Sequence, residues 1–152
     1  MTSQSEHNPF NFQKTVLDNG LRIVTCSMQH TRSVSISIFI GVGSRYESEE
    51  QAGISHFNEH MVFKGTNRRS QPGQISAIIE ATGGVLNAAT EQEMTVFWCK
   101  VAESHFQESL DLLIDMVRDP ILDPGGIEME RMVVLDELSL MNDNPSSKVD
   151  TL

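Results

Sequence analysis

The sequence predicts an α+β fold, in which an antiparallel or mixed sheet carries helices packed on one side. Three observations lead to this prediction. Short β-branched stretches occupy the chain before Gly41, a second pair of such stretches lies near its middle, and two amphipathic helical segments follow toward the C-terminus. With 152 residues, the chain has the length of one domain with a single core.

Five strands are expected. The stretch FQKTVLDNGLRIVTCSM, residues 12–28, predicts a hairpin, because the Asn-Gly pair within 18–20 tolerates the backbone angles of a tight turn. Residues 33–44 alternate serine with valine and isoleucine, which indicates a strand with one buried face. Residues 85–90 and 94–102, VLNAAT and MTVFWCKVA, predict a further pair of strands.

Two helices are expected between the third strand and the last pair of strands. The segment from about Ile54 to Phe63 has helical spacing, and Gly65 stands where the C-terminus of a helix would be capped. A second helix is expected from about Gln71 to Ala81, and it ends before two consecutive glycines.

Two more helices close the chain. The segment SHFQESLDLLIDMVRDP repeats apolar residues at helical spacing, with Ser104 as the expected N-cap and Pro120 just after its end. The last helix is expected from about Pro124 to Met141, with Asp123 as its cap and the proline in its first turn.

The net charge and the two cysteines indicate which partners and which cellular location to expect. The formal net charge is −10, with 21 acidic and 11 basic residues, so we expect neither a nucleic acid nor a membrane as partner. The segment MTSQSEHNPF has none of the features of a secretory signal, and no apolar run approaches the roughly 18 residues of a membrane helix. Cys26 and Cys99 are far apart and are expected to be reduced thiols, which favours a cytoplasmic location.

One short segment carries the candidate chemistry. In GISHFNEHMVFKGT, His56 and His60 are four positions apart, so a helix would place both imidazoles on one face, within reach of one metal ion. Glu59 lies beside that face and could accept a proton from a water that the metal holds. A histidine in an apolar segment is more often a core residue, but this combination favours a Zn²⁺ site over an ordinary core.

A catalytic zinc site usually has a third protein ligand and one open position. The segment ERMVVLDELSLM offers Glu137, and Glu130 lies two turns earlier on the same side of that helix as a supporting carboxylate. Asp136 is the competitor, about 100° around the helix from Glu137. The residues alone leave this choice open.

Three separated motifs resemble one family. HFNEHMVFKGT is similar to the His-x-x-Glu-His helix of the pitrilysin or insulysin-type metallopeptidases, the inverted zincins, which include the mitochondrial processing peptidase. GGVLNAATEQEMTVFW and ERMVVLDELSLMNDNP are similar to two further stretches of that family. The resemblance runs from about Phe12 to Asn144, and its spacing favours Glu137 over Asp136.

The resemblance implies a site and a mechanism. It implies His56, His60 and Glu137 as zinc ligands, Glu59 as general base and Glu130 as a supporting carboxylate. It further implies that a substrate peptide adds as a strand near three residues of the segment VLNAAT, which are Asn87, Ala88 and Thr90. The expected function is therefore that of a zinc-dependent endopeptidase.

The chain departs from the family pattern in two ways. Asn58 stands where the family usually has an aliphatic residue, and the chain is much shorter than either half of a family member. We therefore expect residues 1–11 to be a flexible N-terminus, 12–144 to be the N-terminal metal-binding part of a metallopeptidase half-domain, and 145–152 to be a truncated end. Such a fragment would have little activity alone.

The resemblance also implies partners and an alternative. The remainder of the same chain or a homologous subunit would complete the substrate chamber, and a fragment with an exposed sheet edge would form homo-oligomers. The alternative is a non-catalytic scaffold subunit of a processing-peptidase-like complex, which has no need of a general base. A purely structural zinc would require a fourth protein ligand, for which the sequence has no obvious candidate.

Overall fold

The structure is a computed structural model that describes residues 11–143. The described chain forms two compact units, one before Ser33 and one from Ser33 onward. Apart from Asn11, the expected flexible terminus 1–11 lies outside the described residues, as does the expected truncated end 145–152. The domain boundaries expected from the sequence remain a prediction.

The first unit is a β-hairpin. Strands β1 (Phe12–Val16) and β2 (Arg22–Cys26) pair antiparallel in register from one end to the other. Gly20 has a φ of 85°, and the backbone N–H of Leu21 donates to Oδ1 of Asn19 at 3.1 Å. The hairpin predicted from the Asn-Gly pair is therefore confirmed.

The second unit is built on a three-stranded antiparallel sheet with the order β3-β5-β4. Its strands are β3 (Ser33–Ile40), β4 (Val85–Thr90) and β5 (Thr95–Ala102). Burial alternates along each strand, so one face of the sheet is packed and the other is more open. In the part of the chain that the structure describes, β4 pairs with β5 alone and is an edge strand.

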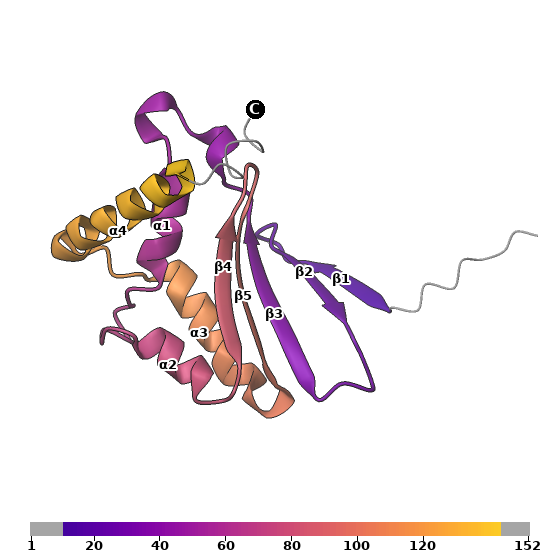
Figure 1. The fold of residues 1–152 in the computed structure, drawn as a ribbon. Coiled ribbons are helices and arrows are strands. Elements are labelled where there is room, and N and C mark those ends of the chain that lie inside the picture. The colour runs from indigo at the N-terminus through magenta and orange to yellow at the C-terminus, as the bar shows by residue number, and fades with distance from the viewer. Residues whose placement is uncertain (1–10, 144–152) are drawn as a thin grey trace, which may run out of the picture. The chain divides into compact units, whose positions relative to one another are not determined.

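Helices cover one face of this sheet (Figure 1). They are α1 (Ile54–Val62), α2 (Gln74–Glu80), α3 (Phe106–Arg118) and α4 (Pro124–Asp143). Helices α1, α2 and α3 contact the strands, whereas α4 packs against α1. The α+β class with helices on one side of an antiparallel sheet is confirmed. No helix within 11–143 is long and apolar enough to cross a membrane.

The core lies between the sheet and helices α1, α2 and α3. Apolar side chains point from alternate strand positions toward the buried faces of these helices. The fully buried members are Val62, Ile75, Ile79, Phe97, Cys99, Val101, Leu112, Leu113 and Met116. This core holds α1 against β4, which is the part of the fold that matters for the candidate site.

The segment after α1 is tied to α3 by buried polar contacts. Thr66 is fully buried, and its hydroxyl donates to Oδ2 of Asp115 at 2.7 Å. The guanidinium of Arg69 forms ion pairs with Asp115 and with Asp111. Because Asp115 is itself buried, these partners are needed to compensate its charge. The end of α1 is thereby anchored to the core.

Three predicted helix boundaries differ from the structure. Ser104 is not the N-cap of α3, because the chain first makes a 3₁₀ turn over Glu103–His105. Helix α2 begins only after Gly73, whose φ of 73° turns the chain into it. Helix α1 ends at Val62 without using Gly65 as its cap.

Gly65 has a different role. Its φ is 143°, a value that favours glycine, and an added Cβ would lie 2.9 Å from the carbonyl oxygen of Arg69. The predicted cap of α4 is correct, because the backbone N–H of Gly126 donates to Oδ2 of Asp123 at 2.9 Å.

Candidate metal centre

Helix α1 places the two predicted imidazole ligands together. Their Nε2 atoms lie 3.2 Å apart, and the rings meet edge to face with centroids 4.7 Å apart. The spacing of four residues between His56 and His60 puts both on one side of the helix, as the sequence predicts. Both side chains are partly exposed, so an ion could reach them.

Helix α4 brings a carboxylate to the same place. Oε2 of Glu137 lies 3.4 Å from Nε2 of His60 and 3.9 Å from Nε2 of His56. Metal–ligand bonds of about 2.0–2.1 Å at tetrahedral angles place donor atoms about 3.3 Å apart. Two imidazole nitrogens and one carboxylate oxygen at these separations fit a zinc ion with an open fourth position.

Asp136 does not take part in this group. It is exposed, whereas Glu137 is partly buried and faces the two histidines. The structure therefore brings together the three residues that the family resemblance implies, and leaves the competing carboxylate in solvent. Asn58, the residue that departs from the family pattern, is also exposed.

Glu130 orients one of the imidazoles. Its Oε1 lies 2.9 Å from Nδ1 of His60, and the carboxylate is 4% exposed. Since an ionised carboxylate can only accept, Nδ1 carries the proton and Nε2 presents its lone pair toward His56 and Glu137. This is the supporting position in which the sequence expects Glu130.

Lys64 also contacts Glu130, and the sequence did not lead us to predict this contact. Its ammonium forms an ion pair with Oε2 of Glu130. Burial is the largest influence on the pKa of Glu130 and raises it, but the hydrogen bonds and charges of Lys64 and His60 together outweigh burial and lower the pKa. The only available signal was the position of Lys64, four residues after His60.

Glu59 stands apart from the three possible ligands. Its Oε2 accepts a hydrogen bond of 2.5 Å from the hydroxyl of Thr90 on β4. The side chain is half-buried and follows His56 by three positions on α1. The contact with Thr90 could not be foreseen, because the two residues are 31 positions apart and belong to different elements.

The three residues expected to contact substrate lie along the edge strand β4. Ala88 and Thr90 are half-buried on the helix side, and Asn87 points to the opposite, exposed side. The backbone N–H of Ala88 donates to the Oδ1 of Asn87 at 2.9 Å rather than to β5. That amide therefore belongs to the free edge of the sheet.

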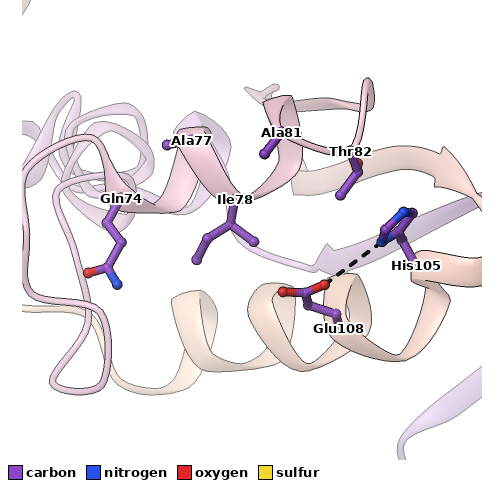
Figure 2. Close-up of a pocket in the computed structure, with 7 residues that line it drawn as sticks. All are labelled: Gln74, Ala77, Ile78, Ala81, Thr82, His105 and Glu108. Atoms are coloured by element: carbon purple, nitrogen blue, oxygen red, sulfur yellow. Dashed lines mark ion pairs between the residues drawn. The ribbon is translucent and has the colours of Figure 1, made fainter.

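A hollow lies between α2 and the start of α3 (Figure 2). It has a volume of about 450 Å³. Nδ1 of His105 and Oε2 of Glu108 form a long ion pair of 3.9 Å there. The hollow is lined by Gln74, Ala77, Ile78, Ala81, Thr82, His105 and Glu108. None of the possible metal ligands is among them, and no convergent set of reactive groups lines this hollow.

Comparisons with known proteins identify a family and several relatives that are similar to this chain. A family model described as insulinase (peptidase family M16) matches residues 22–152. A relative from Rickettsia felis, named "uncharacterized zinc protease", is 38% identical over 139 residues, which are 91% of this chain and 34% of that protein. A protein of Arabidopsis thaliana, named "probable mitochondrial-processing peptidase subunit beta", is 40% identical over 124 residues, 82% of this chain and 23% of that protein.

The fold is similar to a solved structure as well. A protease from Helicobacter pylori superposes with a TM-score of 0.86 at 28% identity, over 91% of this chain and 34% of that chain. The chain thus spans about a third, or less, of the length of these proteins.

Proposed function

The chain belongs to the insulinase family of peptidases, and we propose from this premise that the protein is a zinc-dependent endopeptidase whose centre is built by α1 and α4. The single observation that supports this proposal is the convergence of His56, His60 and Glu137, whose donor atoms all lie within 4.8 Å of one another. Relatives named zinc proteases support the choice of metal.

The three ligands would hold zinc through the two Nε2 atoms and the carboxylate of Glu137. When bound there, zinc would lower the pKa of a coordinated water toward about 7 and polarise the carbonyl of a peptide bond. Glu130 keeps the His60 ring in the orientation that binding requires, because it fixes the proton on Nδ1.

Glu59 would act as the general base. It would accept a proton from the attacking water and then donate it to the nitrogen of the leaving peptide fragment. Among the described residues, Thr90 alone hydrogen-bonds the Glu59 carboxylate, and it does so at Oε2. The second oxygen, Oε1, is therefore available for this proton.

The substrate would be an extended peptide that adds to the free edge of β4. The backbone amide of Ala88 points to that edge and could pair with a carbonyl oxygen of the peptide. Asn87, Ala88 and Thr90 would then follow the bound strand. Since Thr90 hydrogen-bonds Glu59, a peptide bound along this edge would lie near the proposed base.

To enclose a substrate peptide, the whole protein would need more surface than this chain supplies. The relatives are about three times longer, so we propose that the remainder of the chain or a homologous subunit encloses the peptide. Positioning contributes a large part of an enzyme's rate, so these 152 residues alone should bind zinc with little turnover. They should also self-associate through the edge of β4.

The test is the Glu59→Gln variant of the full-length protein. It should retain one zinc per chain by elemental analysis and lose peptide hydrolysis by about 100-fold or more, because the base is removed and the ligands remain. Asp136→Asn is the control, as this exposed carboxylate stands beside Glu137 and should change neither quantity. Unchanged hydrolysis by Glu59→Gln would contradict the mechanism, whereas the absence of hydrolysis by the wild-type full-length protein would favour a scaffold subunit.

A further inference from the structure

We propose that Thr90 is a positioning residue for Glu59: its hydroxyl holds the carboxylate in the orientation that proton transfer requires. The inference rests on the proposed function and deepens it. It gives Thr90 a role that differs from contact with substrate, since the side chain acts on the base while the backbone belongs to the edge strand.

The contact has the geometry of a strong hydrogen bond. Oγ1 of Thr90 lies 2.5 Å from Oε2 of Glu59, within the range of O–H···O⁻ bonds to an ionised carboxylate. Both side chains are half-buried, so water competes less than at an exposed site. A glutamate carboxylate is attached to its helix through three rotatable bonds and needs such a partner to keep one orientation.

A second hydroxyl lies near that of Thr90 but does not direct its proton. Thr95 is buried, and its Oγ1 donates to the backbone carbonyl oxygen of Val42 at 3.0 Å. The two threonine hydroxyl oxygens are 3.4 Å apart. Each hydroxyl has one proton. The proton of Thr95 is used on Val42, and the Glu59 carboxylate is the nearer and stronger acceptor for Thr90, so the proton of Thr90 goes to Glu59 whether or not Thr95 is present.

The arrangement links substrate binding to the base. Thr90 is the last residue of β4, the strand whose free edge would receive the peptide, and Glu59 lies on the helix that carries both imidazoles. A peptide paired with β4 and a carboxylate hydrogen-bonded to β4 would both be positioned by the same strand. Errors of about 1 Å in such placement can cost about 100-fold in rate.

The experiment compares Thr90→Val, which keeps the shape and removes the hydroxyl, with Thr90→Ser, which keeps the hydroxyl. Both are made in the full-length zinc-loaded protein and assayed on an internally quenched peptide that the wild type cleaves. For Thr90→Val, kcat should fall by about 10-fold to 100-fold with KM and zinc content unchanged, because only the orientation of the base is lost. Thr90→Ser should retain most of the activity.

A control and a structural measurement separate this role from a purely structural one. Thr95→Val removes the neighbouring hydroxyl and should lower the melting temperature while leaving kcat near that of the wild type. Crystal structures of the wild type and Thr90→Val should show the Glu59 carboxylate in different orientations. This readout does not depend on catalysis.

Each other result would overturn the proposal. If Thr90→Val is fully active, or if its Glu59 carboxylate is unmoved, the hydroxyl does not position the base. If Thr90→Ser loses as much activity as Thr90→Val, the shape of the side chain is responsible. If KM alone rises, Thr90 is a substrate contact. Where Glu59→Gln is inactive and Thr90→Val is not, this inference alone fails; where Glu59→Gln is fully active, the proposed function fails with it.

Discussion

Helices α1 and α4 both supply possible metal ligands, yet they are held in very different ways. Helix α1 is fixed at both ends: the Glu47 carboxylate accepts hydrogen bonds from the backbone N–H groups of Gly53 and Ser55 at its start, and Met61 and Val62 are 2% exposed near its end. The segment that follows is anchored to α3 through Thr66.

Helix α4 has little apolar burial. Of its side chains that the structure describes, only Glu130 and Val134 are buried. Its exposed apolar side chains are Met129, Met132, Val133, Leu135, Leu138, Leu140 and Met141. Helix α4 makes polar contacts with α1 and the segment just after it, from Glu130 to His60 and Lys64 and from Glu137 to the imidazoles. The two imidazole ligands are thus placed by the core, and the carboxylate ligand is placed mainly by charged groups.

The largest expected effect compares the same substitution on the two helices. Met61→Ala on α1 should destabilise the 152-residue chain by about 2–5 kcal/mol, because a buried side chain that is 2% exposed leaves a cavity. Met129→Ala on α4 should change stability by no more than about 0.5 kcal/mol, because Met129 is 71% exposed. Urea unfolding measures both. Equal losses would show that α4 is packed as firmly as α1.

An intermediate effect is expected where the two helices meet. Glu130→Gln removes the charge that pairs with Lys64 and orients His60, so zinc affinity should fall by about 10-fold to 100-fold. Competition with a chelator measures it. Glu128→Gln is the control, since Glu128 is exposed and pairs with Arg131 at 3.3 Å on the outside of α4. If both variants bind zinc equally weakly, the cause is total charge and not the contact with His60.

The smallest effect is expected at the start of α1. Glu47→Gln should cost about 1 kcal/mol of stability, because a weaker acceptor then caps the helix. The Ser55 side chain, followed by the backbone amides of Ser55 and Gly53, lowers the pKa of Glu47 below its ordinary value. The carboxylate therefore contributes its stability fully above the unfolded-state pKa and loses it as pH falls through the lower folded-state pKa.

The measurement is urea unfolding of the wild type and Glu47→Gln over a series of acidic pH values. The two proteins should differ near neutral pH and converge as the carboxylate is protonated. Glu50→Gln is the matched control, because Glu50 is exposed in the neighbouring 3₁₀ turn. A difference that persists at the lowest pH would contradict a role for the charge.

Much of the fold could be predicted because its signals are local. The period of two along 33–40 predicts β3, and the Asn-Gly pair predicts the hairpin of β1 and β2. Boundaries were less predictable. Ser104 has the chemistry of an N-cap, but the chain makes a 3₁₀ turn there first, and no sequence signal distinguishes these outcomes.

The candidate site, too, has a part that could be predicted from the sequence and a part that could not. Two imidazoles and a glutamate within five positions are recognisable because a helix converts that spacing into one face. The contacts of Lys64 with Glu130 and of Thr90 with Glu59 were missed, because each joins elements that are far apart in the sequence. Contacts of this kind leave no periodic pattern in the amino-acid sequence.

The amino-acid order was therefore sufficient for the helix that presents His56 and His60, since hydrogen bonding along one turn determines which side chains neighbour each other. Helix geometry alone left open whether Asp136 or Glu137 joins them, and only the family resemblance favoured Glu137. That choice depends on how α4 lies against α1, which Glu130 and the surrounding charges determine. Packing between separate elements decided it, because the angle at which one helix faces another is a property of their joint surface and of neither sequence alone.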